Sequence, residues 1–403
     1  MNLTMEMVKA LQKEHGDAFY LLDSALFQRN YLEMKREFSS LYANFNIAYS
    51  YKTNYTPKLC KLVDSMGGYA EVVSEMELEL AERLGVRLEK IIWNGPVKSR
   101  DVMERLLLSG GTVNLDSMED LRLAAGIAAC HIGQKMNVGI RCNYDVGDGV
   151  VSRFGFDVDG GDFEEAMDVI QKSDVLHLKN FQCHFARRQL AYWPARVRGM
   201  LALLDRLGFV PDRIDLGGGM YGNMPEDLKK QLGGSIPSYR DYAGVAAGMF
   251  AEKFAKAEFQ PELVVEPGSA LVGDCMKFVA TVKSIKSVRG KVFATLLGSQ
   301  KNISMSGVNP PIEVLNMGND GRYYSDVTMT GYTCIESDVL VTGYNGYLSV
   351  GDVVIFSNCG SYSLVMKPPF ILPNFPVLDI GSGAWEVVKE CENFDDIFHT
   401  FSF

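Results

Sequence analysis

Short apolar runs rich in β-branched and aromatic residues alternate with amphipathic stretches over residues 45–268. In Ser74–Leu84 and Ser117–Ala128, apolar residues recur at the three-to-four spacing of a helix. The pattern predicts eight strands between such helices: Phe45–Lys52, Tyr69–Val73, Ile91–Gly95, Val113–Asp116, Met136–Asn143, Phe181–Ala186, Arg213–Gly219 and Glu262–Gly268.

Strand–helix alternation of this kind indicates βαβ units and an α/β fold with a parallel sheet. Eight repeats favour a closed (β/α)8 barrel over an open sheet. A Rossmann-like fold is the alternative, because Gly217-Gly218-Gly219 follows a predicted strand. That triplet is not G-x-G-x-x-G, and it follows the seventh strand rather than the first.

After about Val272 the pattern changes to period-two runs separated by turn residues. The runs are Lys277–Ile285, Lys291–Leu297, Val339–Thr342 and Asp352–Phe356. Alternation of this type predicts an antiparallel β domain. We therefore expect a barrel over residues 24–272 and a β domain over 273–403, with residues 1–23 contributing to the second.

Composition narrows the class of protein. A chain of 403 residues is long enough for two domains, and its net charge of −10 disfavours nucleic acid and anionic membranes as partners. No apolar run reaches the ~18 residues of a spanning helix, and the polar first residues are unlike a signal peptide. Eight scattered cysteines form no metal-ligand or disulfide pattern. We expect no metal and a reducing, cytoplasmic location.

The residues with the most distinctive chemistry lie where predicted strands end. In a (β/α)8 barrel these carboxyl ends meet on one face, where the catalytic groups gather. A lysine there can form a Schiff base, and glycine lets backbone N–H groups approach a phosphate. The residues at these ends are Lys52, Glu71, Arg141, His184, Gly219 and Glu266.

Five motifs follow Lys52-Thr53-Asn54 along the chain. They are Cys183-His184-Phe185, Leu216-Gly217-Gly218-Gly219, Val265-Glu266-Pro267-Gly268, Gly331-Tyr332-Thr333-Cys334 and Cys359-Gly360-Ser361-Tyr362. In this order they resemble the pyridoxal-phosphate decarboxylases of the alanine racemase-like fold, the diaminopimelate and ornithine decarboxylase family. The resemblance runs from about Tyr20 to Pro376. It implies pyridoxal phosphate as cofactor, a homodimer with shared active sites, and an N-terminal segment, Phe19–Leu22, paired into the β domain.

The resemblance also implies roles in the barrel. Lys52 holds the cofactor, His184 stacks on it, and Glu266 faces the pyridine nitrogen, where a carboxylate suits decarboxylation. Glu71 replaces the family's aspartate and orients either His184 or Lys52. Arg141 is expected near the cofactor, and an ion pair between it and Glu266 is a structural alternative.

Further roles fall on the C-terminal part of the chain. By resemblance, Cys334 donates a proton to Cα from a loop that reaches the neighbouring subunit. Glu336 and Asp338, which follow it, correspond to acids that bind the substrate's distal amine, and the alternative is that both only cover a subunit interface. Tyr362 matches a tyrosine whose hydroxyl reaches the cofactor phosphate.

Two departures from the family pattern concern the phosphate. Ser269 stands where the family has an arginine, and Arg187 stands where it has a serine. A phosphate needs a nearby cation, so we hypothesise that Arg187 and Ser269 have exchanged roles beside Gly218, Gly219 and Gly268.

A third departure concerns the substrate. The segment 302–310 contains neither the arginine nor the tyrosine that diaminopimelate decarboxylases use for the distal carboxylate. Diaminopimelate is therefore doubtful, and a diamino acid or an amino-acid conjugate of siderophore or other specialised biosynthesis is expected.

The sequence thus predicts a pyridoxal-phosphate-dependent amino-acid decarboxylase acting on a small-molecule substrate. Two alternatives remain open. One is an amino-acid racemase or epimerase, which Glu266 and the Cys334 loop disfavour, because racemases of this fold place an arginine at the ring nitrogen. The other is an inactive paralogue that regulates a true decarboxylase, although the expected cofactor residues are retained.

Overall fold

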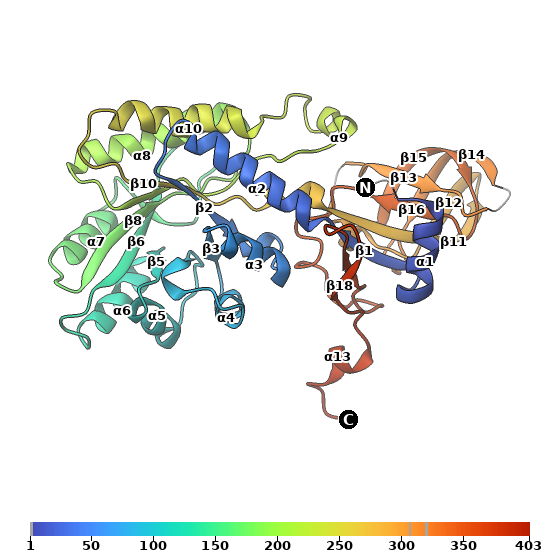
Figure 1. The fold of residues 1–403 in the computed structure, drawn as a ribbon, viewed down its shortest axis with the longest axis horizontal. Helices are drawn as coiled ribbons and strands as arrows, with labels where there is room; N and C mark the ends of the chain where they lie inside the picture. The colour runs from blue at the N-terminus through green and yellow to red at the C-terminus, as the bar shows by residue number, and fades with distance from the viewer. Residues whose placement is uncertain (1–2, 306–307, 319–320) are drawn as a thin grey trace. The chain divides into compact units, whose positions relative to one another are not determined.

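The computed structural model describes residues 3–305, 308–318 and 321–403, and Figure 1 shows its fold. It separates into two compact units, which we call the barrel unit and the β unit. The barrel unit consists of Arg29–Gly222 and Pro237–Ala270, and the β unit of Met1–Gln28, Asn223–Ile236 and Leu271–Phe403. Residues 306–307, within the segment considered for substrate recognition, lie outside the described residues.

Eight parallel strands form a closed barrel, because each strand pairs with the next and β10 pairs back with β2. The strands are β2 (Phe45–Ser50), β3 (Tyr69–Val72), β4 (Ile91–Trp93), β5 (Thr112–Leu115), β6 (Met136–Asn143), β8 (Leu176–Gln182), β9 (Arg213–Asp215) and β10 (Glu262–Val265). A short strand, β7 (Phe156–Asp157), pairs with β6. The predicted (β/α)8 barrel is confirmed, and the open Rossmann-like sheet is wrong.

Helices cover the outside of the barrel (Figure 1). They are α2 (Ser24–Ser39), α3 (Pro57–Ser65), α4 (Glu75–Arg83), α5 (Arg100–Leu108), α6 (Met118–Ala128), α7 (Gly161–Gln171), α8 (Trp193–Leu207) and α10 (Tyr239–Phe254). Serine side chains set where two of them begin: Ser74 accepts a hydrogen bond from the N–H of Glu77, and Ser117 accepts one from Asp120.

Several strand ends differ from the prediction, and those of β8 and β2 bear on the site. β8 begins at Leu176, five residues before the predicted start, because polar His177 and Lys179 alternate with its buried residues and hide the strand. Both β8 and β2 also end earlier than predicted. His184 therefore lies beyond β8, and Lys52 lies in a 3₁₀ turn, η1 (Tyr51–Thr53), rather than in the strand itself.

Period-two alternation arranges the barrel interior in layers. Ala48, Tyr69, Ile92 and Val264, from four strands, pack together as an apolar layer. The residue two positions further along each of these four segments is polar and buried: Ser50, Glu71, Asn94 and Glu266. An apolar layer thus lies one step below a polar layer at the carboxyl ends of the strands.

The β unit contains a separate sheet. Its strands are β1 (Ala18–Leu22), β11 (Met276–Val288), β12 (Lys291–Leu296), β13 (Ile312–Leu315), β14 (Arg322–Thr330), β15 (Val339–Leu348), β16 (Val353–Phe356), β17 (Val377–Asp379) and β18 (Glu386–Lys389). Most pairs are antiparallel, and β1 pairs antiparallel with β11. Strands β13 and β14 were not predicted.

Short helices complete the β unit: α1 (Met5–His15), α9 (Glu226–Gln231), α12 (Gln300–Ile303) and α13 (Phe394–Phe398), while α11 (Ser269–Val272) begins in the barrel unit. Its core combines α1 with the sheet, through residues such as Val8, Leu11, Phe19 and Val279. Segment 223–236 joins this unit because Gln231 exchanges two hydrogen bonds with the backbone of Asn309, at 2.8 and 3.0 Å.

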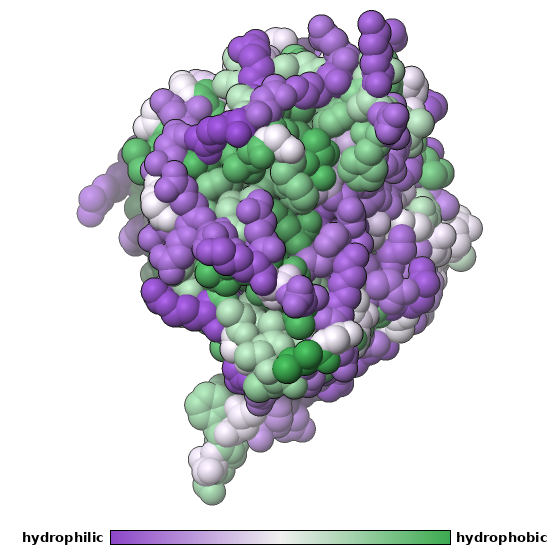
Figure 2. All heavy atoms as spheres, turned by 90° about the vertical axis from the view of Figure 1, so that its left-hand side faces the viewer, coloured by the Kyte–Doolittle hydropathy of each residue, from purple (hydrophilic) through white to green (hydrophobic). Residues whose placement is uncertain are grey.

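Figure 2 shows hydrophilic side chains around the edge of one face and apolar ones nearer its middle. Among the described residues, no helix combines the length and apolar character needed to cross a membrane.

Candidate active site

Lys52 enters the barrel mouth from the turn after β2. Its Nζ lies 2.6 Å from Oε2 of Glu71, which is fully buried, whereas the Lys52 side chain is 33% exposed. A charge-assisted hydrogen bond of this length fixes the direction of the lysine side chain. The sequence analysis expected Glu71 to orient either His184 or Lys52, and in the structure Glu71 contacts Lys52.

Glu71 has further donors. The hydroxyl of Ser50 donates to the same oxygen, and the amide of Asn94 donates to Oε1 at 3.1 Å. Asn94 in turn accepts from the amide of Asn114 at 2.6 Å, and Asn114 accepts from Asn180 at 3.0 Å. A chain of amides from the end of β4, from β5 and from β8 therefore holds the carboxylate in place.

Glu266 is buried in the same layer. Asn94 donates to its Oε1, and Gln182 donates to both of its oxygens at 3.3 Å. Burial, with the negative charges of Asp215 and Glu71 nearby, raises the pKa of Glu266 well above its ordinary value. Burial and these neighbouring charges thus favour the protonated form of the Glu266 carboxyl.

Asp215 is the carboxyl partner of Glu266. Burial raises the pKa of Asp215 to about 6, while its Oδ1 accepts the N–H of Gly217 at 2.8 Å. Its Oδ2 is buried and has no amide or hydroxyl donor among the described residues. Burial thus raises the pKa of both carboxyls, and a proton on either of them is favoured over its ordinary tendency to ionise.

His184 is neutral. Its Nδ1 accepts the backbone N–H of Gly218 at 3.0 Å, so the ring proton is on Nε2. Burial, followed by the positive charges of Lys52 and Arg196, lowers its pKa well below the ordinary value. The 3.9 Å approach of Nδ1 to Glu266 is therefore not an ion pair.

Arg141 does not pair with Glu266, so the alternative ion pair proposed from the sequence is wrong. Its guanidinium lies 3.6 Å from Asp116, and its Cζ lies 4.6 Å from the ring centre of Phe154. Arg153 lies 4.0 Å from the same ring centre. Two cations therefore flank one phenyl ring at the edge of the pocket.

These groups line one cavity of about 280 Å³. Lys52, Glu71, Arg141, His184 and Glu266, five of the residues named from the sequence, belong to its wall. Asn94, Gln182, Arg153 and Phe154 also line it and were missed. Strand-end polar residues such as Asn94 could have been found from the barrel prediction alone.

The glycines beside the cavity are needed for close packing. A Cβ on Gly218 would lie 2.5 Å from the carbonyl oxygen of Glu266, and one on Gly268 would lie 2.0 Å from Oγ1 of Thr53. Gly219 has φ of +80°, a conformation that glycine adopts without strain. Backbone N–H groups can thus approach a ligand here, as a phosphate requires.

The predicted cation, Arg187, is exposed, and Ser269 begins α11. A different arginine contacts the glycine loop. Arg196, on α8, is 1% exposed and donates to the carbonyl oxygens of Gly218 at 2.6 Å and Phe185 at 3.0 Å. The sequence could have indicated that Arg196 lies on an apolar helix face, because Met200 and Leu203 are buried on the same face.

The remaining predicted residues lie in the β unit. Cys334 and Glu336 are exposed, and Tyr362 has φ of +62°, a strained value for a non-glycine residue. Strain of this kind often marks a functional position.

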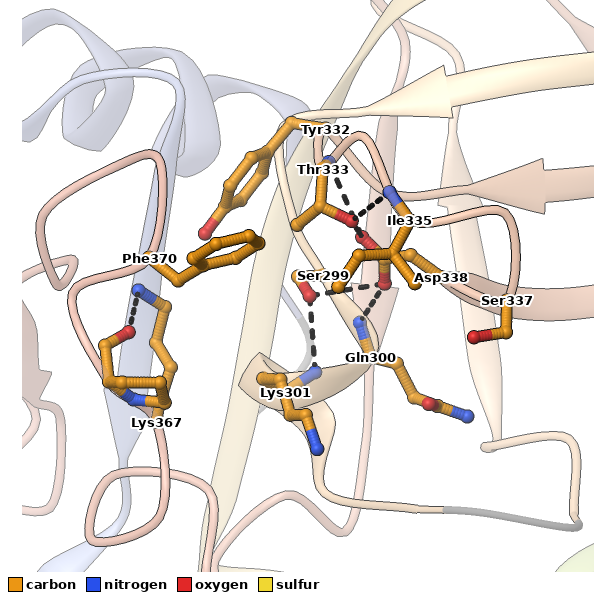
Figure 3. Close-up of a pocket in the computed structure, with 11 residues that line it drawn as sticks. Ser299, Gln300, Lys301, Tyr332, Thr333, Ile335, Ser337, Asp338, Lys367 and Phe370 are labelled. Carbon is orange, nitrogen blue, oxygen red and sulfur yellow. Dashed lines mark hydrogen bonds between the residues drawn. The ribbon is translucent and has the colours of Figure 1, made fainter.

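Asp338 is bound by Thr333 of its own loop and by Ser299 and Gln300 of a distant segment (Figure 3). Oδ1 accepts from Ser299 at 3.1 Å and the N–H of Gln300 at 2.7 Å, and Oδ2 accepts from the hydroxyl and N–H of Thr333 at 2.6 and 3.4 Å. Four donors occupy all the lone pairs of a carboxylate. A cavity of about 390 Å³ lies beside it, lined by residues that include Tyr332 and Phe370.

Comparison with known proteins identifies the family. Residues 25–273 match the model of the pyridoxal-dependent decarboxylase, pyridoxal binding domain. The chain belongs to the pyridoxal-dependent decarboxylase family. Its cofactor is pyridoxal phosphate, and its reaction class is amino-acid decarboxylation.

Relatives along the full length agree with this family. The chain is 26% identical to diaminopimelate decarboxylase of Archaeoglobus fulgidus, over 98% of this chain and 96% of that one. It is 25% identical to L-glutamyl-[BtrI acyl-carrier protein] decarboxylase of Niallia circulans, over 99% and 97%. The crystal structure of diaminopimelate decarboxylase from M. jannaschii matches with a TM-score of 0.86 and 21% identity, over 98% and 94%.

The site fits the cofactor of this family. A lysine amine, a buried carboxyl with a raised pKa and glycines that allow close backbone approach converge on one side of the barrel. Pyridoxal phosphate has an aldehyde, a ring nitrogen and a phosphate for such groups to bind. The two relatives act on different substrates, yet this chain is almost equally identical to both. Sequence identity therefore does not favour either substrate.

Proposed function

We propose that the chain decarboxylates a diamino acid or an amino-acid conjugate, at a site completed by two copies of the chain. The observation that carries the proposal is the 2.6 Å pairing of Lys52 with buried Glu71, in one pocket with neutral His184 and with Glu266, whose pKa is raised by burial. This pocket offers an amine, an acid and an uncharged ring in fixed positions.

Lys52 is the residue that would hold the cofactor covalently, through its side-chain amine. Glu71 keeps the lysine at the barrel mouth and is the acceptor nearest to its proton. When bound, pyridoxal phosphate withdraws electrons from the bond to Cα that breaks. Neutral His184 offers an uncharged ring face to the cofactor, as stacking requires.

Glu266 supplies an acid to the ring nitrogen. Burial and the charges of Asp215 and Glu71 raise its pKa, so this carboxyl would hold a proton beside the ring nitrogen more readily than an exposed glutamate does. Arg141, held by Asp116, contributes positive charge at the pocket edge.

Gly218, Gly219, Gly268 and Ser269 form the proposed phosphate site in the barrel unit. In the β unit, the Tyr362 hydroxyl is the proposed further contact. Arg187 is the exposed candidate cation, and its exchange of roles with Ser269 stays a hypothesis.

The Cys334 loop provides the rest of the site in a neighbouring subunit. The Cys334 thiol is the proposed proton donor to Cα, and its exposure suits a group that acts on another chain. Because Asp338 is occupied, Glu336 is the acid of this loop available to a distal amine.

The cavity beside Asp338 supports a substrate larger than a free amino acid. At about 390 Å³ it lies within the size range of small-molecule sites, and Tyr332 and Phe370 give it aromatic walls. No disulfide is present among the described residues, which supports a cytoplasmic location for the homodimer.

Carbon dioxide release from a substrate panel tests the proposal. The panel contains ornithine, lysine, diaminopimelate, diaminopropionate, their acylated or citryl conjugates, and glutamate joined to a carrier protein. We expect release from a diamino acid or a conjugate, lost in Lys52→Ala and retained in Lys61→Ala, an exposed lysine on α3. Exchange of the α-hydrogen with racemisation, without carbon dioxide, would instead establish a racemase.

A further inference from the structure

Arg196 is a buried cation without a carboxylate partner. Its guanidinium binds three backbone carbonyl oxygens, those of Leu216 at 3.2 Å, Gly218 at 2.6 Å and Phe185 at 3.0 Å. Among the described residues no carboxylate forms an ion pair with it, and its Nε has no acceptor. A buried charge is costly unless another charge compensates it, so this arginine calls for an anion nearby.

The glycine loop is the place where such an anion can bind. Carbonyl and N–H of a trans peptide point in opposite directions. Because the Gly218 carbonyl points at Arg196, the N–H of Gly219 in the same peptide points away from it. Arg196 therefore fixes the direction of this donor.

The Gly219 N–H is also the one left available in the loop. Within the part of the chain that the structure describes, the Gly217 N–H binds Asp215 and the Gly218 N–H binds His184, while the Gly219 N–H has no acceptor. A guanidinium on the carbonyl side strengthens the donor on the opposite side of the peptide.

The guanidinium also lies close behind Gly219. A Cβ on that glycine would lie 3.5 Å from Nη2 of Arg196. One layer of backbone thus separates a full positive charge from the outer side of the loop. Solvent ions screen such a buried charge much less than they screen an exposed arginine.

We propose that Arg196 is a positioning residue for the cofactor phosphate: it aligns the Gly219 N–H and supplies a fixed positive charge from beneath the loop. This rests on the proposed function. Buried Arg196, rather than exposed Arg187, then supplies the positive charge that the sequence analysis expected near the phosphate. The dianionic phosphate is then the counter-ion that Arg196 lacks.

The test compares binding of pyridoxal phosphate with binding of pyridoxal, which has no phosphate. The preference between the two, measured as a ratio of dissociation constants on the full-length protein, cancels general damage to the pocket. Arg196→Gln keeps amide donors for the carbonyls and removes the charge. Arg198→Gln makes the same charge change at an exposed position of the same helix.

We expect Arg196→Gln to reduce the preference for the phosphorylated ligand by roughly 10- to 100-fold, with pyridoxal binding nearly unchanged, and Arg198→Gln to leave the preference intact. An unaltered preference in a folded Arg196→Gln protein would overturn the proposal.

A second measurement needs no variant. If the phosphate's cation is buried, the preference of the unmodified protein stays within about threefold between low and high potassium chloride. A tenfold or larger fall would assign the phosphate to exposed cations and overturn the role of Arg196. Failure of the unmodified protein to bind pyridoxal phosphate at all would instead defeat the proposed function.

Discussion

The barrel pocket and the Cys334 loop both contain buried acids, but they use them differently. In the barrel, burial raises the pKa of Glu266 and of Asp215 beside it, and Glu71 holds the Lys52 amine. In the β unit, hydroxyl and N–H groups of Thr333 in the same loop, and of Ser299 and Gln300 outside it, occupy Asp338. The difference teaches that burial alone does not make an acid reactive. An acid whose oxygens are all bound by neighbouring donors is structural, whereas one with free hydrogen-bonding capacity can take part in chemistry.

The barrel pocket is therefore arranged for chemistry within one chain. The Cys334 loop is held rigid by Asp338 and presents its reactive residues, Cys334 and Glu336, on the outside. On this account the loop acts on a second copy of the chain.

The largest expected effect is on the barrel side. Lys52→Ala removes the amine that binds the cofactor, so we expect decarboxylation to fall by at least roughly 1000-fold. The protein should still fold, because Lys52 is not part of the apolar layer, but its thermal midpoint should fall because buried Glu71 loses its 2.6 Å partner. Steady-state carbon dioxide assays measure the first and calorimetry the second, with Lys61→Ala as control. Near-normal activity in Lys52→Ala would refute the assignment.

The second prediction joins the two regions. Neither Lys52→Ala nor Cys334→Ala should be active alone, yet their mixture should recover about a quarter of the activity. Half of the randomly exchanged dimers are mixed, and each carries one site with both original residues. Activity is measured after subunit exchange, which mass spectrometry verifies. An inactive mixture after demonstrated exchange would show that the two residues do not form a site across subunits.

The third prediction separates two acids of the loop. Glu336→Gln should lower kcat/KM for a diamino substrate by roughly 10- to 100-fold without changing stability, because it removes a partner charge for the distal ammonium. Asp338→Asn should instead lower the free energy of unfolding by about 1–3 kcal/mol, since it weakens four hydrogen bonds of the loop. Urea titration measures the stability of each variant, and substrate kinetics measure its kcat/KM. A loss of stability in Glu336→Gln and a loss of kcat/KM in Asp338→Asn would contradict the assignment of roles to these two acids.

The fourth prediction concerns protonation in the barrel unit. Burial raises the pKa of Glu77 to about 7, from 4.5. The folded protein thus holds a proton that the unfolded chain releases between these values, and stability falls as pH rises through about 7. Between pH 5 and 8, the unmodified protein should lose on the order of 1–3 kcal/mol that Glu77→Gln retains. The control is exposed Glu79→Gln, and parallel urea midpoints for all three proteins would contradict the shift.

The barrel and several of its site residues could be predicted because their signals are local. Strand–helix alternation gives the fold, and strand ends give Lys52, Glu71 and Glu266. The pairing of Arg141 with Asp116 could not be read, because it depends on which of several acids lies nearest in space.

Two further features needed the coordinates. The occupancy of Asp338 depends on Ser299 and Gln300, nearly forty residues earlier in the chain. Arg196 gave only an indirect sign, a charged residue on the apolar face of α8, and its contact with the glycine loop depends on tertiary packing. Long-range polar contacts of this kind have no periodicity to reveal them.

Borohydride reduction of the purified protein loaded with pyridoxal phosphate, followed by peptide mapping, tests the central claim most directly. The account predicts that the reduced cofactor is attached to one peptide, the one that contains Lys52, and that the visible absorbance is lost in proportion. Attachment at another lysine, or no attachment by a protein that binds the cofactor, would contradict it.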